Sequence, residues 1–184
     1  MKYLLQSTFV VSFFYFFTPQ VTAQTHKITP AIAAKIQARV DSAAQVFKIN
    51  FKENNGDNLG DAEFALDTFK IEQATEYAFA FDRSTMGMNA TVNKATANYD
   101  SLMNKYYKKL LARLQGDDKQ TLINAQREWL KLKEFEINLI GTISHPKYSG
   151  GGSIQSNINI ATINEMVKHR ASTIYGYYAR TTEQ

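Results

Sequence analysis

The chain has 184 residues, with 21 Lys and Arg against 17 Asp and Glu, three His and no Cys. Without cysteine it can form no disulfide, Cys-ligated zinc site or iron–sulfur cluster, and it has no thiol nucleophile. The formal net charge is only +4, and basic and acidic residues are interspersed, which argues against a nucleic-acid-binding surface. With 44% hydrophobic residues, three Pro and nine Gly, the composition favours a globular domain of long helices.

Residues 1–23 have the pattern of a secretory signal peptide. Lys2 precedes an apolar run from Tyr3 to Phe17, and Val21-Thr22-Ala23 forms a cleavage site. The run is shorter than the roughly 20 residues that span a bilayer, so an uncleaved anchor is the less favoured alternative. No Cys follows that could carry a lipid. We therefore expect a periplasmic or secreted protein that is not a lipoprotein, without membrane insertion after signal removal, and a mature net charge of 4 − 1 = +3.

Two helices are expected in the N-terminal half. Thr29-Pro30 is a typical helix start, and an apolar face follows at helical spacing, made of Ile32, Ile36, Val40, Ala43 and Phe47. A polar, glycine-containing loop over 54–60 separates it from a second helix, which we expect to run from near Asp61 to Phe81. This pair, 27–82, is interpreted as an addition to the rest of the domain.

The third and fourth helices are the clearest elements of the sequence. An apolar stripe holds its i, i+3, i+4 spacing through 85–115, in Met88, Val92, Ala95, Tyr99, Leu102, Met103, Tyr106, Leu110 and Leu114. Gly116 ends this helix, and the short turn predicts an antiparallel hairpin with the next one. The stripe expected to face inward on the fourth helix consists of Leu122, Ala125, Trp129, Leu132 and Leu139.

A loop over 141–152 precedes a last helix that begins near Ser153 and carries Ile160, Ile163, Val167, Ile174 and Tyr178 inward. No alternating run indicates a strand. We therefore predict an all-α fold, an antiparallel bundle of about five helices around the long central helix, in one domain over 24–184.

The sequence gives little indication of a catalytic or metal-binding site. His26, His145 and His169 have no metal-ligand spacing. Glu134 and Glu136 lie two residues apart on a helix and so point to different faces. Glu136 is interpreted as a structural partner of a cation such as Arg170 or Lys133 rather than as a general acid. We expect no catalytic residue, no metal and no cofactor, and hence no enzyme.

The loop over 141–152 is the best candidate for binding. Lys147 and Tyr148 are plausible anchors for a partner protein. Gly150, Gly151 and Gly152 precede a helix start, where free backbone N–H groups can bind an anion. No Lys follows them as in a P-loop, so a tight turn is the favoured interpretation.

The third to fifth helices together resemble the LprI-type lysozyme inhibitor family over 85–178. The matching motifs are Asp100, Leu102, Asn104 and Tyr107, then Ala125-Gln126-Arg127-Glu128-Trp129, Glu136, Gly151-Gly152-Ser153 and a late Arg170. The family's cysteines, near Thr91, Ile137 and Ala161, are absent here, and Lys133 and Met103 replace its usual Arg and Leu.

The resemblance implies a non-enzymatic inhibitor whose partner is a lysozyme. Another envelope protein or a cell-wall glycan, bound by a structural module, stays open as the alternative. The oligomeric state is not indicated. Asp100, Asn104, Gln126, Arg127, Trp129, Glu136 and Arg170 are interpreted as structural. Trp129 is expected to be buried between the third and last helices, Arg127 to bind Asp100 or Glu136, and Arg170 to be paired within the bundle.

Overall fold

The computed structural model describes residues 27–55 and 59–182. The signal peptide expected over 1–23 and His26 lie outside the described residues. The helices are α1 (Pro30–Asn55), α2 (Leu59–Phe81), α3 (Thr85–Arg113), α4 (Gly116–Ile143), α5 (Pro146–Ser149) and α6 (Ile154–Arg180). No strand occurs in the described part of the chain, so the all-α prediction is confirmed. Helix α5, a single turn inside the expected loop, is the one element that the periodicity did not indicate.

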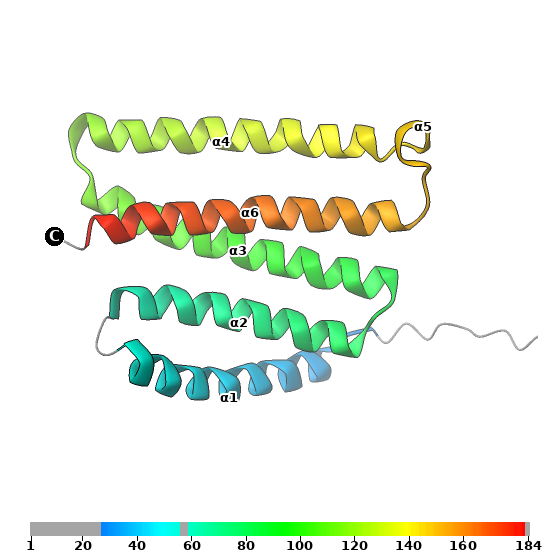
Figure 1. The fold of residues 1–184 in the computed structure, drawn as a ribbon, viewed down its shortest axis with the longest axis horizontal. Coiled ribbons are helices and arrows are strands. Elements are labelled where there is room, and N and C mark those ends of the chain that lie inside the picture. Colours follow the sequence, from blue (N-terminus) through cyan, green and yellow to red (C-terminus); the bar gives the residue numbers. More distant parts are fainter. Residues whose placement is uncertain (1–26, 56–58, 183–184) are drawn as a thin grey trace, which may run out of the picture.

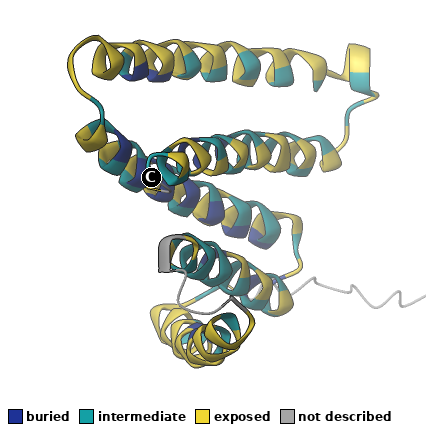
Figure 2. Ribbon diagram, turned by 60° about the vertical axis from the view of Figure 1, so that its left-hand side comes forward, coloured by how far each residue is buried: buried dark blue, intermediate teal, exposed yellow. Residues whose placement is uncertain are grey.

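The long helices lie in a row, with α1 at one edge and α4 at the other (Figure 1). Helix α3 occupies the middle and packs most extensively on α6, while its other side contacts α2. Helix α1 contacts α2, and α4 contacts α6. Burial is concentrated on α3 and its neighbours (Figure 2), so α3 is the central helix that the sequence predicts.

The core lies where α3 meets α6. Tyr99, Met103, Tyr106, Val167 and Ile174 are each at most 2% exposed. These residues belong to the stripes expected on the two helices, because side chains three and four positions apart share one face of a helix. Burial of such large side chains contributes roughly 1.5–3 kcal/mol each, which makes this interface the main source of stability.

The N-terminal pair has a smaller core of its own. Val40 and Ala44 of α1 are each 1% exposed, and the rings of Phe47 and Phe69 stack with centroids 4.4 Å apart. Polar contacts join α2 to α3, among them the ion pair of Lys105 with Glu63 at 2.7 Å. The pair is therefore attached to the rest through α2.

The turn between α2 and α3 explains one glycine. Ser84 caps α3, and its hydroxyl accepts a hydrogen bond from the Gly87 N–H at 3.0 Å. The carboxylate of Asp82 accepts from the Ser84 N–H at 2.9 Å. A Cβ on Gly87 would lie 2.1 Å from Cγ of Asp82. A side chain at position 87 would therefore displace the carboxylate that shapes this turn.

The sequence-based orientation of α4 was wrong in part. Leu122 is buried as expected, but Ala125 is exposed, Leu132 is 54% exposed and Leu139 is 52% exposed. Helix α4 contacts α6 rather than pairing with α3 along its length. Apolar residues occur on several sides of α4, so the pattern does not define one buried face. The residues facing the bundle are Leu122, Gln126, Trp129, Lys133, Glu136 and Ile140.

Among the helices described, none combines the length and the apolar character needed to cross a bilayer.

Candidate binding site at the α4–α6 end of the bundle

The loop between α4 and α6 is a tightly hydrogen-bonded turn. His145 caps α5, and its Nδ1 accepts a hydrogen bond from the Lys147 N–H at 3.3 Å. The Ser149 hydroxyl donates to the Ser144 carbonyl at 2.9 Å and accepts from the Gly151 N–H at 3.1 Å. The Ser144 hydroxyl is 2.6 Å from Asn159 Oδ1 of α6. These bonds fix the loop to both flanking helices.

Three consecutive glycines complete the turn. Gly150, Gly151 and Gly152 have φ of +75°, +76° and +91°, a region that L side chains adopt only with strain. A Cβ at Gly151 would also lie 3.3 Å from Cγ of Pro146. The glycines thus serve the geometry of the turn, and no anion is needed to explain them.

The tip of this loop carries the anchors that the sequence indicates. Lys147 and Tyr148 are both exposed, Tyr148 to 59%. The Lys147 ammonium lies 5.2 Å from the centroid of the Tyr148 ring, close enough for a cation–π contact. An aromatic and a cation are thus presented together on a rigid turn.

Family-motif residues meet between α3, α4 and α6. The Arg170 guanidinium donates from Nε and Nη2 to Oε1 of Gln126, at 3.1 and 3.0 Å. Gln126, 7% exposed, in turn directs its Nε2 to the Met103 sulfur at 3.6 Å. Arg170 also lies 5.5 Å from the Trp129 ring centroid, and Lys133 lies 5.4 Å from it.

Arg170 is held by neutral groups. No carboxylate of the described residues is within ion-pairing distance of its guanidinium, and burial lowers its pKa below the ordinary value. The charge partner expected for Arg170 is therefore absent from the described residues, and an amide and an indole ring lie against the guanidinium instead. Trp129, expected to be buried between the third and last helices, packs against the core and is half-buried.

The other motif residues lie apart from this cluster. Asp100 accepts a hydrogen bond from Nδ2 of Asn104 at 3.0 Å on the surface of α3. Arg127 is exposed and has no contact with Asp100 or Glu136, which corrects the expected bond. Glu136 is half-buried beside α6, without an ion pair to a described residue.

A polar network that the sequence does not indicate joins α2, α3 and α6. The Tyr99 hydroxyl donates to the Glu72 carboxylate, which also pairs with Lys168 at 2.6 Å. Burial raises the pKa of Tyr99, and Glu72 and Glu165 raise it further. For Glu72, burial raises the pKa, but the bonds from Lys168 and Tyr99 outweigh it, so the pKa lies below its usual value.

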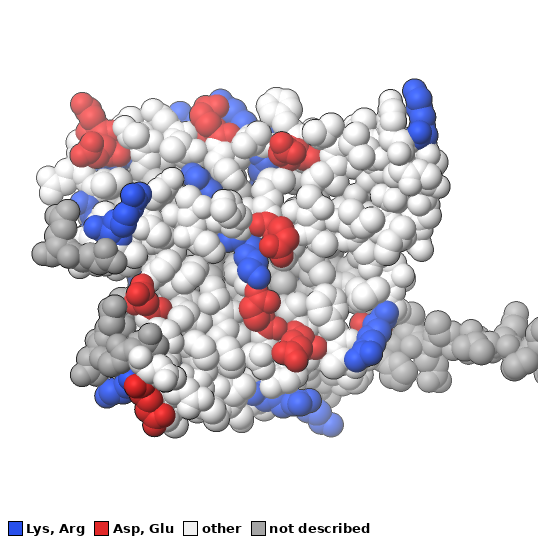
Figure 3. Space-filling view, viewed as in Figure 1, with Lys and Arg blue, Asp and Glu red and all other residues white. Residues whose placement is uncertain are grey.

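Acidic side chains gather near this network. Figure 3 shows them grouped over the middle of the face formed by α6, α3 and α2. The residues on this part of the surface include Glu72, Glu76 and Glu165. Lys168 and Glu72 lie 96 positions apart along the chain. Such a pair has no local sequence signal, and the sequence therefore did not predict it.

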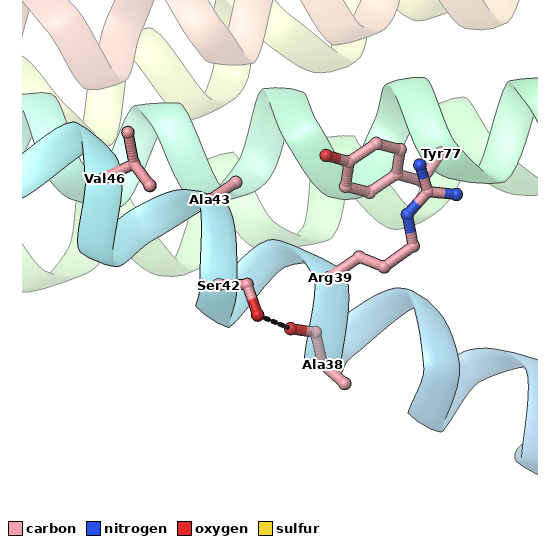
Figure 4. A pocket seen from close by; sticks show the side chains of 6 residues that line it. All are labelled: Ala38, Arg39, Ser42, Ala43, Val46 and Tyr77. Atoms are coloured by element: carbon pink, nitrogen blue, oxygen red, sulfur yellow. Dashed lines mark hydrogen bonds between the residues drawn. The ribbon is translucent and has the colours of Figure 1, made fainter.

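An open hollow lies between α1 and α2 (Figure 4). Ser42 donates to the Ala38 carbonyl at 3.1 Å, and the Arg39 guanidinium lies 4.3 Å from the Tyr77 ring centroid. Its polar groups are thus engaged with one another. Within 27–55 and 59–182 no group of three His, Asp or Glu side chains could hold a metal ion.

A scan against protein families matches residues 80–173 to the family described as Lysozyme inhibitor LprI. The match runs from the end of α2 into α6 and includes both the glycine turn and the cluster around Gln126 and Arg170. No curated protein and no solved structure gives a significant match. The matched region spans just over half of the chain and carries the motifs described above, and the chain therefore belongs to the LprI lysozyme inhibitor family.

Proposed function

We propose that this protein is an exported, non-enzymatic binding protein that inhibits a lysozyme, and that the loop between α4 and α6 contacts the enzyme. The observation that carries the proposal is the pairing of Lys147 with exposed Tyr148 on a hydrogen-bonded, glycine-built turn. Tyr is among the residues that contribute most to protein interfaces, and a backbone already held in a fixed turn loses less conformational entropy on binding. The family name supports the class of partner.

The positive net charge of this protein limits which lysozymes it can bind. Many lysozymes are strongly basic, and a mature chain of net charge +3 would be repelled by them at long range. The acidic group formed by Glu72, Glu76 and Glu165 would offset this locally if that face also turned toward the enzyme. Alternatively, the partner is a less basic lysozyme, which an enzyme panel distinguishes.

The test is inhibition of cell-wall hydrolysis by a panel of lysozymes of different isoelectric points. We expect inhibition of at least one enzyme by the purified protein, and a loss of at least tenfold in affinity for the double variant Lys147→Ala with Tyr148→Ala. The matched control is Tyr177→Ala with Arg180→Ala, because this pair makes the same contact, with 5.1 Å between cation and ring centroid, near the far end of α6.

The control variant should inhibit as the parent does. Nanomolar inhibition that survives removal of Lys147 and Tyr148 would exclude the loop from the interface. Absence of inhibition across the panel, together with binding to purified cell-wall glycan, would favour the envelope glycan-binding module instead.

Export is a separate part of the proposal. The intact mass of the protein from the envelope fraction should correspond to residues 24–184, because Val21-Thr22-Ala23 offers the best cleavage site. A full-length mass would indicate an anchored form.

A further inference from the structure

A cavity of about 310 Å³ opens between α1, α2 and α3, away from the α4–α6 loop. It exists because small side chains meet where three helices converge. Five alanines line it, namely Ala33, Ala74, Ala78, Ala90 and Ala95. Alanine side chains leave the space between helix backbones unfilled, and apolar cavities lined in this way favour apolar ligands over water.

One polar group in the wall has no partner in the described part of the chain. Thr91 lines the cavity, is 5% exposed, and its buried hydroxyl makes no hydrogen bond to a described residue. Other helical threonines nearby donate to the carbonyl four residues earlier: Thr75 to Ile71 at 2.8 Å and Thr96 to Val92 at 2.9 Å. A buried hydroxyl without a partner costs stability, and a polar atom of a ligand beside Thr91 would remove this cost.

A lysine lies at the mouth of the cavity. Lys94, one turn after Ala90 on α3, is exposed, lines the cavity and forms no ion pair with a described residue. Asn98 lies beside it on the same wall. An apolar interior with a cation and an amide at its mouth matches an amphiphile whose anionic head stays near solvent.

We propose that this cavity binds the hydrocarbon chain of a single-chain carboxylate, with the chain among the alanines and the carboxylate at Lys94. The volume limits the ligand. An apolar cavity of about 150 Å³ accepts benzene, so about 310 Å³ holds on the order of ten carbon atoms. A two-chain lipid would not fit. The proposal is independent of lysozyme inhibition.

The test is calorimetric titration of the purified protein with decanoate below its micellar concentration, and with decanol. We expect saturable 1:1 binding of decanoate and weaker binding of decanol. Ala74→Leu should abolish binding, because its larger side chain occupies the cavity, and thermal unfolding should show that the variant is folded. Lys94→Ala should weaken decanoate binding about two- to fivefold, as removal of an exposed ion pair does, and leave decanol binding unchanged.

The matched control is Lys108→Ala, an exposed Lys of the same helix outside the cavity, which should bind as the parent does. No saturable decanoate binding, or binding that Ala74→Leu leaves intact, overturns the proposal. Equal effects of Lys94→Ala and Lys108→Ala would overturn the role of Lys94. Because the variants leave Lys147 and Tyr148 untouched, lysozyme inhibition measured on them separates this result from the proposed function.

Discussion

Tyr99 and Tyr106 lie on the same buried face of α3, yet their hydroxyl groups have different surroundings. The Tyr99 hydroxyl donates to Glu72, whereas the buried Tyr106 hydroxyl has no hydrogen-bond partner among residues 27–55 and 59–182. Burial raises the pKa of Tyr106 well above its usual value. An unpartnered buried hydroxyl loses its hydration and gains nothing in return, so the same chemical change at the two positions should have opposite consequences.

Tyr106→Phe should therefore leave stability unchanged or raise it by up to about 1 kcal/mol, because the ring contacts remain and the costly hydroxyl is removed. Tyr99→Phe should lower stability by about 1.5 kcal/mol, the lower end for a bond to a charged group, since Glu72 is half-exposed. Denaturant titration of both variants measures the difference. Equal losses would mean that the Tyr106 hydroxyl has a partner in solution.

Arg170 offers a second comparison between residues. Arg170→Ala should destabilise the protein by about 1–3 kcal/mol, because it leaves the buried Gln126 oxygen without its two donors. Arg170→Lys should restore little, since an ammonium lacks the planar fork that directs two N–H groups onto the Gln126 oxygen and cannot lie flat beside an indole. Arg127→Ala is the control, because Arg127 is exposed. Melting temperatures of Arg170→Ala and Arg170→Lys equal to the parent's would assign Arg170 to surface recognition instead.

At the scale of elements, glycine has two different roles. In the turn after α5, three glycines hold positive φ. Gly176 lies inside α6, and a Cβ there would meet nothing within 4 Å. The turn requires glycine, because L side chains rarely adopt positive φ. At position 176 the structure does not require glycine, and glycine has a lower helix propensity than alanine.

Gly151→Ala should destabilise the protein by about 1–2 kcal/mol, from backbone strain and the contact with Pro146. Gly176→Ala should stabilise it by roughly 0.5–1 kcal/mol. The shifts in melting temperature of the two variants show whether each change lowers or raises stability. If Gly151→Ala leaves the melting temperature unchanged, the turn rearranges without cost, and the binding loop is not rigid.

At the scale of the whole molecule, carboxylates of α2 help to hold the N-terminal pair on the central helices. Glu63 pairs with Lys105 and Lys109 of α3, and Glu72 pairs with Lys168 of α6. Bonds from Lys105 and Lys109 place the pKa of Glu63 below its ordinary 4.5. A carboxylate whose pKa is lower in the folded state stabilises the fold above pH 4.5 and loses that contribution as the pH falls through its folded pKa.

We therefore expect stability to fall as the pH is lowered from about 5 to 3, with each exposed pair contributing about 0.2–1 kcal/mol. Glu63→Gln with Glu72→Gln should reduce stability at pH 7 and flatten this dependence. The control is Glu53→Gln, an exposed acid near the end of α1. A double variant with the parent's pH dependence would show that other carboxylates cause the acid loss.

The sequence alone determined the long helices and the buried stripes of α3 and α6, because each depends on a periodic pattern within one segment. Helices begin or end at residues that the sequence marks as breaks, namely Ser84, Gly116 and the three glycines 150–152. The stripe predicted most of the core of α3 correctly, since its members Ala95, Tyr99, Leu102, Met103, Tyr106 and Leu110 are all buried. The motif around Gln126 and Trp129 likewise identified the family.

The tertiary structure decided what each face contacts. Because apolar residues lie on several sides of α4, its predicted inward stripe was wrong in part. Contact with α6 leaves Leu132 and Leu139 exposed and turns Gln126 toward Arg170. Likewise, the bond of Tyr99 to Glu72 and the cavity beside Thr91 arise from residues of separate helices. A periodic stripe specifies that a face is buried, but the residues opposite it depend on how the helices pack, which local pattern does not encode.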